Sequence, residues 1–513
     1  MLETIELVVL AFAPWPLYRA LAIPPFRRFY TCFAIGVLVF LVVYALAVAL
    51  LAIYLPVLLH AAAILAIGIL FWERWRARSD YGKVRNLPPG SLALVPREPW
   101  IDHRFYLKQA KVNGPVFKAS LFFRPMICVV GADQGHELLR EHGDALRAPS
   151  VRFNRFIPRG LLRYMEGDDH ARYRKLFQTG IARSVLQDSA ESIESDVRNS
   201  LNGIANSSEN TGALGVNPRA AFREMLLLIL LRLFFGISED ADVFQRLCKL
   251  YEKLDIRKAA CGSGKREVEA AREIAEIVKQ QADFAKKQAI DGIPTPASFL
   301  AEILKHEPQV ISDDTVILNL VYTVQVACTD MTSLLMWVAK KMSDNFEVVE
   351  QLRLQNSDVD QPSRPAGSQL ASAIVKETLR LDQSEYLYRS ALDDIQFKGF
   401  AIPKGWLIRI CIREGHRNPE IFPDPERFDP HRFIDHSYGP REYSPLGMLS
   451  HSCLGAQIVD LVGRTFVTVL TKEFDWLVVS DGPREFGASH WATSSKFRIN
   501  LRTRQPKAAQ SLA

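Results

Sequence analysis

Apolar residues are spread unevenly along the chain, and the longest apolar run lies near the amino terminus. From Tyr30 to Trp72 the sequence is almost wholly apolar, and His60 is the one residue of this run that can carry a charge. The run is about 43 residues long, whereas one membrane-spanning helix needs roughly 20, and Pro56 can open a second helix near its middle. Arginines flank both ends: Arg27, Arg28, Arg74, Arg76 and Arg78. These flanks predict a helical hairpin within residues 30–72 that leaves the rest of the chain in the cytosol.

The residues before this run fit a cleaved signal peptide poorly, because Pro14 and Pro16 interrupt the first apolar segment and no compact basic start precedes it. A buried hairpin of a soluble domain is the alternative, but helices of soluble domains normally carry a polar face. Residues 1–86 are therefore predicted to anchor the chain in a membrane, the endoplasmic reticulum of a eukaryote or the inner membrane of a bacterium.

Beyond the anchor, the pattern predicts a few early strands and then mainly helices. Residues 115–131 predict two short strands broken near Arg124 and Pro125, followed by a helix. Helical periodicity dominates from about residue 168 to 341, where EMLLLILLRLFFG predicts a core helix, and polar stretches at 203–217 and 355–368 predict loops. We expect a mainly α-helical catalytic domain with small β-sheets at residues 87–503 and a tail at 504–513.

The composition excludes several classes of function and says less about the fold. The 513 residues are 48% hydrophobic and 23% charged, which supplies one large core and an anchor. The formal net charge of +6 is small and spread along the chain, which argues against nucleic acid as a partner. The seven cysteines are scattered and never form Cys-x-x-Cys, so they indicate a reducing compartment without a disulfide framework or zinc ribbon.

Cys453 is the first candidate for chemistry. It lies in the segment LGMLSHSCLGAQIVDLVGRTFVTVL, ahead of a long apolar helix. Free N–H groups at a helix amino terminus favour the thiolate, and Gly455 lets the backbone pass close to a flat ring. Such a thiolate can bind a metal, whereas a cysteine before a helix is otherwise a small buried hydrophobe.

Four further segments bear on this cysteine: ETLR at residues 377–380, PDPERFDPHRF, the stretch from GFAIPKGW to PDPERF, and GDDHARYRKLF. Together with the Cys453 loop, they resemble the cytochrome P-450 superfamily in order and spacing. Glu377-Thr378-Leu379-Arg380 matches the family's Glu-x-x-Arg, whose spacing of three puts acid and guanidinium on one helix face. PDPERFDPHRF places Arg427 at the basic residue that completes a buried ion network in the family. The longer stretch from GFAIPKGW to PDPERF also matches.

The fourth segment, GDDHARYRKLF, resembles a family helix that reaches the haem propionates. By this resemblance His170 and Arg174, together with Arg389 and His451, contact these two carboxylates. Guanidinium and ring N–H groups suit that role because they donate hydrogen bonds to carboxylates.

The resemblance implies that Cys453 binds the iron of haem b, iron protoporphyrin IX, and that electrons from NADPH arrive through a separate redox partner, a diflavin reductase or a ferredoxin. It implies a monooxygenase that inserts oxygen from O2 into a lipophilic small molecule that partitions into the membrane, in secondary-metabolite biosynthesis. By position, substrate contacts would come from residues 151–162, Tyr322, Val326, Leu387 and residues 489–493.

In the family, a long helix lies on the side of the haem opposite the cysteine. The segment of this chain that matches that helix departs from the family's sequence. In Ala327-Cys328-Thr329-Asp330-Met331-Thr332, the acid Asp330 is kept, but Met331 replaces the Thr that relays protons in the family. A thioether cannot donate a hydrogen bond. Thr332 or a substrate hydroxyl is expected to take over, unless Met331 only fills space. Catalysis is therefore predicted to be substrate-assisted or diverted to an unusual oxidation.

The Cys453 loop departs as well, because Leu446 replaces the family's Phe and Leu449 replaces a Gly. Two other functions remain open at this stage. One is a haem-dependent isomerase or dehydratase that needs no external electrons, which Met331 favours. The other is a non-catalytic protein that binds haem or a sterol, which the two leucines favour.

Overall fold

The structure is a computed structural model of the chain. The residues that it describes are 38–44, 63–68, 84–92, 98–121, 124–149, 157–239, 242–255, 264–293, 295–357, 366–383, 387–486 and 490–504. The chain divides into two compact units. The smaller unit contains Met1–Val129, Ala391–Ile408 and Glu485–Ala488, and the larger contains Val130–Ser390, Arg409–Arg484 and Ser489–Ala513.

Besides the helical pieces at 38–44 and 63–68, the smaller unit holds short strands with two short helices. Its elements are α5 (Glu98–Ile101), α6 (Phe105–Asn113), β1 (Val116–Leu121), β2 (Arg124–Val130), β5 (Ile395–Phe397), β6 (Phe400–Ile402) and β9 (Glu485–Phe486). Strands β1 and β2 pair antiparallel with Phe117 opposite Cys128, so the two predicted strands are confirmed. A two-residue turn joins β5 to β6, and both Lys398 and Gly399 have positive φ, as a tight hairpin turn requires.

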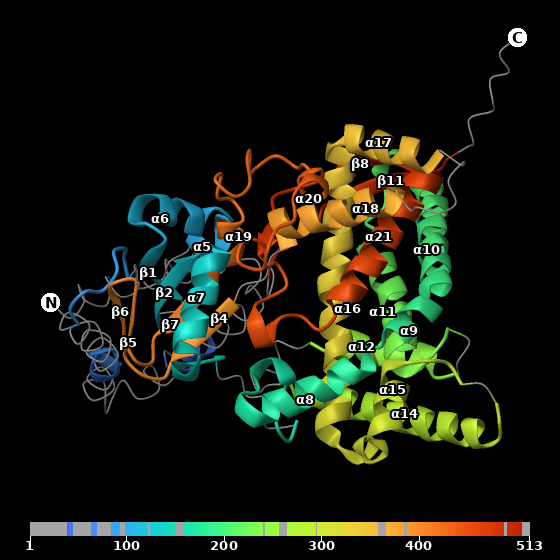
Figure 1. Cartoon of the computed structure of the whole chain (residues 1–513), viewed down its shortest axis with the longest axis horizontal. Helices are drawn as coiled ribbons and strands as arrows, with labels where there is room; N and C mark the ends of the chain where they lie inside the picture. The colour runs from blue at the N-terminus through green and yellow to red at the C-terminus, as the bar shows by residue number, and fades with distance from the viewer. Residues whose placement is uncertain are drawn as a thin grey trace, which may run out of the picture. The chain divides into compact units, whose positions relative to one another are not determined.

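The larger unit is mainly helical (Figure 1). Its longer helices are α7 (Ala132–His142), α8 (Gly167–Gly180), α9 (Arg183–Asp188), α10 (Ala190–Thr211), α11 (Arg219–Phe235), α12 (Phe244–Lys253), α14 (Lys265–Ile290), α15 (Phe299–His306), α16 (Asp314–Asp344), α17 (Phe346–Ser357), α18 (Ala366–Thr378) and α21 (Ala456–Glu473). Single-turn helices and strands complete it: η2 (Gly143–Ala145), β3 (Leu146–Arg147), η4 (Leu162–Tyr164), η5 (Gly212–Leu214), η6 (Pro308–Ser312), η7 (Leu379–Gln383), β4 (Leu387–Ala391), β7 (Leu407–Cys411), α19 (Ile412–Gly415), α20 (Arg432–Asp435), η8 (Leu449–His451), β8 (Phe474–Ser480), β10 (Trp491–Ala492) and β11 (Arg498–Thr503). Strands β4 and β7 each extend slightly across the division between the units.

Helix α16 is the centre of the larger unit. It packs against α11, α14 and α18, and α18 packs against α21 (Figure 1). Gly463 of α21 allows this last contact, because a Cβ at that position would lie 2.8 Å from a methyl group of Val375. Helix α11 is buried from Met225 to Phe235, apart from Arg232, because this part of its sequence is apolar on nearly every face. The predicted core helix is thus confirmed, and Gly236 ends it in the left-handed conformation.

The loop predicted at residues 203–217 is wrong in its first part, because α10 continues to Thr211. Three polar residues there are compatible with the helix since their hydroxyls donate to carbonyls of the preceding turn: Ser207 to Gly203 at 2.8 Å, Ser208 to Ile204 at 2.9 Å, and Thr211 to Ser207 at 3.1 Å. The loop predicted at 355–368 lies largely outside the described residues, and its described ends are helical instead, since 355–357 belong to α17 and 366–368 to α18.

Two pieces of the predicted anchor are described, residues 38–44 and 63–68, and both are helical. Their large apolar side chains are exposed, Phe40 by 68% and Leu65 by 64%. Within the described part of the chain, none of the helices combines the length and the apolar character needed to cross a membrane. Most of the predicted hairpin lies outside that part.

Candidate functional site

Cys453 stands in a tight turn that leads into α21. The turn closes where the Cys453 N–H donates to the Leu446 carbonyl at 2.8 Å. Gly447 and Leu449 both have positive φ, 89° and 52°. Leu449 therefore keeps the left-handed conformation that a glycine adopts without strain, at a cost of roughly 1–2 kcal/mol. The Cys453 side chain is exposed, unlike the buried Cys128, Cys328 and Cys411.

The surroundings of the Cys453 sulfur act on its charge in opposite directions. Desolvation by the protein atoms crowded around it raises the pKa of the thiol, and the negative charge of Asp330 adds to this rise. The Gly455 N–H and the guanidinium groups of Arg163 and Arg174 lower the pKa. The pKa of this exposed thiol is raised overall, and the Gly455 N–H and the two guanidinium groups limit the rise.

Four residues predicted to contact propionates gather beside this turn. Arg174 on α8 donates to the Ser452 carbonyl at 2.9 Å and to the Ser452 hydroxyl at 3.1 Å. The rings of His170 and His451 are stacked, with their centroids 4.1 Å apart. Arg389 on β4 is buried, and its guanidinium donates to the Tyr388 carbonyl at 2.8 Å.

Among these four residues, Arg174 and Arg389 carry more positive charge than the one neighbouring acid, Glu166, offsets. Burial lowers the pKa of His451 to about 3, and Arg389, His170 and Arg174 contribute to this shift. Burial also lowers the pKa of His170 and of Arg389, and Glu166 opposes both shifts. Such mutual repulsion is relieved by an anionic ligand, so the cluster fits the two carboxylates of haem next to an accessible thiol.

Glu377, at the end of α18, is the fully buried centre of an ion network. It accepts two hydrogen bonds from Arg380, at 2.7 and 2.8 Å, and one from the Asp429 N–H at 2.9 Å. The second guanidinium belongs to Arg432, whose Nε lies 3.2 Å from Glu377. The prediction of Arg427 in this role is therefore corrected: its side chain is exposed, and only its backbone carbonyl accepts from Arg380, at 3.3 Å.

His416 connects this network to the turn that holds Cys453. Its carbonyl accepts from Arg380 at 2.7 Å, and its ring Nε2 accepts from the Ser444 N–H at 3.2 Å. Burial and the nearby charges of Arg380 and Arg417 lower the pKa of His416 to about 3, so the ring is neutral and can accept. The network thus fixes the start of the segment that carries Cys453.

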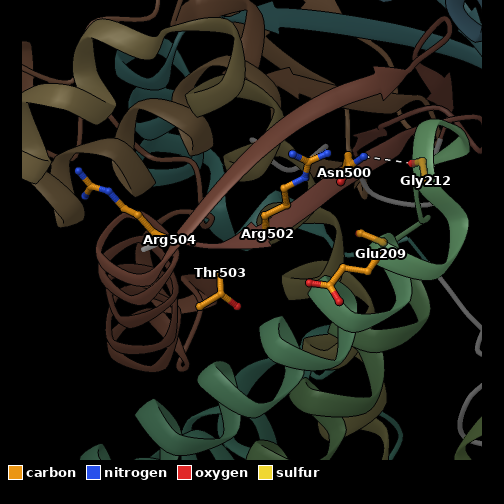
Figure 2. Close-up of a pocket in the computed structure, with 7 residues that line it drawn as sticks. Glu209, Gly212, Asn500, Arg502, Thr503 and Arg504 are labelled. Carbon is orange, nitrogen blue, oxygen red and sulfur yellow. Dashed lines mark hydrogen bonds between the residues drawn. The ribbon is translucent and has the colours of Figure 1, made fainter. Parts of the chain in front are cut away.

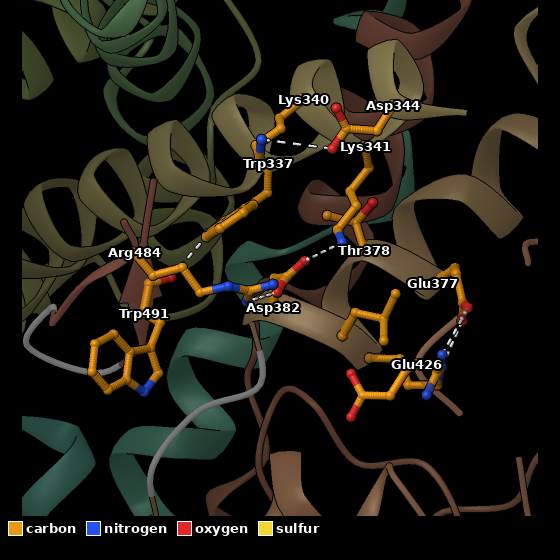
Figure 3. Close-up of polar contacts among 12 residues, drawn as sticks. Trp337, Lys340, Lys341, Asp344, Glu377, Thr378, Asp382, Glu426, Arg484 and Trp491 are labelled. Atoms are coloured by element: carbon orange, nitrogen blue, oxygen red, sulfur yellow. Dashed lines mark hydrogen bonds and ion pairs between the residues drawn. The ribbon is translucent and has the colours of Figure 1, made fainter. Parts of the chain in front are cut away.

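A second buried network surrounds Asp382, which is fully buried in η7. Lys341 of α16 lies 3.2 Å from one carboxylate oxygen, and Arg484 binds the other (Figure 3). The guanidinium of Arg484 also lies over the Trp337 ring at 4.7 Å, and the Trp337 indole donates to the Trp491 carbonyl at 2.9 Å. This network ties the end of α16 to η7 and to the residues around β10.

The predicted relay residues all lie on α16, with different surroundings. Met331 is buried in the main core, with 4% exposure. Thr332 is also buried. Its hydroxyl donates to the Cys328 carbonyl at 2.6 Å, so the hydroxyl proton is engaged in a hydrogen bond within the helix. Asp330 is half-buried, and its charge acts on Cys453. Of these three residues, Asp330 is therefore the one whose charge acts on the Cys453 thiol.

The positions predicted to touch substrate are only partly described. Tyr322 and Leu387 are buried and Val326 is half-buried. Residues 151–156 and Ser489 lie outside the described residues. A pocket of about 740 Å³ lies elsewhere, between α10, η5 and β11, and none of the predicted site residues lines it (Figure 2).

Sequence reasoning missed four residues that organise this region: His416, Arg432, Asp382 and His490. Arg432 lies in the same PERFDPHRF segment as Arg427, so the segment was correct and the residue was not. His490 falls within residues 489–493, which were predicted to touch substrate, and a titratable residue in such a segment is a signal that could have identified it. Nothing in the local pattern marks His416 or Asp382 as buried.

Comparisons with known proteins agree with this geometry. A family model described as cytochrome P-450 matches residues 90–490. Abscisic acid 8'-hydroxylase 2 of Arabidopsis thaliana is 22% identical over 80% of this chain and 88% of its own. An abscisic acid 8'-hydroxylase of Solanum lycopersicum is 25% identical over 77% of this chain and 87% of its own.

Solved structures show the same fold at low identity. The retinoic acid-bound cyanobacterial CYP120A1 has a TM-score of 0.66 at 22% identity, covering 82% of this chain and 99% of that one. A variant of cytochrome P-450 OleT in complex with arachidonic acid has a TM-score of 0.63 at 18% identity, covering 83% and 100%. Because the family model spans most of the sequence, this chain belongs to the cytochrome P-450 family of monooxygenases.

Proposed function

We propose that this chain is a haem-thiolate monooxygenase that hydroxylates a lipophilic small molecule, with Cys453 as the iron ligand. The observation that carries the proposal is an exposed cysteine at the start of α21 that lies beside a cluster of cationic side chains. Haem b bound there supplies oxygen activation, and thiolate ligation favours cleavage of the O–O bond.

The chain's own residues position that group. His170, Arg174, Arg389 and His451 pair with the propionates, which offset the positive charge of the cluster. The network of Glu377, Arg380 and Arg432 holds the backbone that leads to Cys453, and buried ion networks of this kind specify geometry more than they add stability.

Proton delivery falls to α16. Met331 cannot donate a hydrogen bond, and the Thr332 hydroxyl donates within the helix. Asp330 is the acid of this segment, and a hydroxyl on the substrate can assist it. Oxidation is therefore substrate-assisted or depends on a different partner of Asp330.

The substrate is proposed to be an apolar molecule of a biosynthetic pathway for specialised metabolites. The compounds named with the relatives and structural neighbours are abscisic, retinoic and arachidonic acid, all of them carboxylic acids. These three form the first panel for spectral titration. Electrons from NADPH arrive through a diflavin reductase or a ferredoxin.

Residues 1–86 are proposed to anchor the catalytic domain, residues 87–503, on the cytosolic face of a membrane, in the endoplasmic reticulum of a eukaryote. Exposed apolar side chains at 38–44 and 63–68 support this, since large exposed apolar patches mark membrane or protein contacts. Removal of residues 1–86 should release the protein from the membrane fraction while it keeps its haem.

The test of the function compares Cys453→Ser with Cys248→Ser, which changes a partly buried cysteine remote from the predicted ligand role. The reduced carbon-monoxide difference spectrum should show the thiolate carbonyl band in the wild type and in Cys248→Ser and lose it in Cys453→Ser. An unchanged band in Cys453→Ser contradicts the proposal. Product formation without reductase and NADPH identifies an isomerase or dehydratase instead, and lack of turnover with either favours a binding protein.

A further inference from the structure

Gln383 and His490 lie together against the distal segment of α16. Gln383 ends η7, and its side-chain Nε2 donates to the Asp330 carbonyl at 3.0 Å. The same nitrogen lies 3.0 Å from Nε2 of the His490 ring. The other ring nitrogen, Nδ1, lies 3.7 Å from the Asp330 carboxylate. Gln383 and His490 are both buried, whereas Asp330 is half-buried.

The hydrogen bonds determine where the proton of the His490 ring lies. A backbone carbonyl only accepts, so the Gln383 group that faces Asp330 must be the NH₂ group. The same NH₂ group faces Nε2 of His490, which must therefore be the acceptor. A neutral ring then carries its proton on Nδ1, the nitrogen directed at the Asp330 carboxylate.

The charges around His490 agree with a neutral ring. Burial lowers the pKa of His490, the carboxylate of Asp330 raises it, and the guanidinium of Arg219 lowers it. The net direction is downward. The 3.7 Å separation is longer than a hydrogen bond, and contacts of this kind often tighten only when the site is loaded.

We propose that His490 and Gln383 are positioning residues for Asp330, which they hold so that the acid can carry protons in place of the missing family hydroxyl. This inference rests on the proposed function. His490 Nδ1–H fixes one carboxylate oxygen of Asp330. The other oxygen takes up one proton from solvent and releases one proton on the side of α16 that faces Cys453, so the carboxylate is regenerated and His490 keeps its own proton.

Nuclear magnetic resonance of the ferrous carbonyl enzyme, labelled with ¹⁵N-histidine, tests the geometry without turnover. The His490 signal, identified by its loss in His490→Asn, should report a neutral ring protonated on Nδ1. Gln383→Leu should remove this tautomer preference, and Asp330→Asn should lower the pKa of His490 further, because the carboxylate charge raises it. A ring protonated on Nε2 in the wild type overturns the proposal.

Turnover separates positioning from simple packing. His490→Leu should lower product formed per electron about 10-fold, as expected when a proton donor is misplaced, while the spectral Kd for substrate changes less than about 2-fold. His490→Asn should retain most of the coupling, because its amide N–H can replace Nδ1–H. The control is His306→Asn, at the exposed end of α15, which should behave as wild type.

Wild-type coupling in His490→Leu, or equal losses in His490→Leu and His490→Asn, overturns the positioning role. The carbonyl spectrum of each variant keeps the two proposals distinct. Absence of the thiolate band in the wild type contradicts the proposed function. Normal bands in all variants, with unaltered coupling in His490→Leu, contradict only the role of His490.

Discussion

Substitution of Arg432 by Met should destabilise the protein, whereas the same change at Arg427 should not. Both arginines come from the segment PERFDPHRF, but only Arg432 has its guanidinium on the fully buried Glu377. Arg432 is 6% exposed in its side chain, and its Nη1 also donates to the Pro423 carbonyl at 3.0 Å. Arg427 is exposed and contributes a backbone carbonyl, which a substitution leaves in place.

The magnitude follows from what remains after each change. Loss of one partner from a buried ion pair costs roughly 3–5 kcal/mol. Arg432→Met leaves Glu377 and Arg380 as a neutral pair, so the lower end of that range applies, about 3 kcal/mol. Glu377→Gln leaves two buried guanidinium groups without their acid and should cost more. Arg427→Met should stay within about 0.5 kcal/mol, as for surface changes.

Urea titration of the haem-loaded protein, followed by the carbonyl band, measures the difference. With a slope near 3 kcal/mol per molar urea for a chain of this size, Arg432→Met should lower the midpoint by about 1 M. The reasoning is refuted if Arg427→Met lowers the midpoint as much as Arg432→Met does, or if Arg432→Met leaves it unchanged.

Two further predictions use other buried groups. Burial raises the pKa of Asp382, but the charges of Lys341 and Arg484 outweigh it and hold the pKa below its usual range, so the ionised acid adds stability that is present above about pH 4 and lost as pH falls further. Asp382→Asn should lose about 3–5 kcal/mol at pH 7 and show a shallower loss of stability as the pH falls below about 4, measured by urea midpoints; an equal slope contradicts this. In the His490→Leu background, Met331→Thr should restore product per electron by about 10-fold, because the new hydroxyl can relay protons; no recovery counts against the missing-hydroxyl argument.

Local patterns in the sequence were enough for several features of this protein. The strands β1 and β2, the apolar helix α11 and the helix that follows Cys453 were predicted from residues close to one another in the chain. Glu377 and Arg380 meet because a spacing of three puts them on one helix face. Such features depend on backbone periodicity and on neighbouring side chains, which the sequence displays directly.

The remaining features depend on contacts between residues that are far apart in the sequence. Glu377 and Arg432 are 55 residues apart, and Gln383 and His490 are 107 residues apart. Which of two nearby arginines reaches a buried acid, or which nitrogen of a histidine carries the proton, depends on how distant segments meet. Likewise, the polar residues of 203–211 lie in α10, which packs against β11 and α21, and Ser208 accepts the Leu501 N–H of β11 at 3.2 Å. The sequence alone therefore identified the helices and the iron ligand candidate, whereas the tertiary structure determined which charged and polar side chains meet around them, because those partners are brought together only by the folded core.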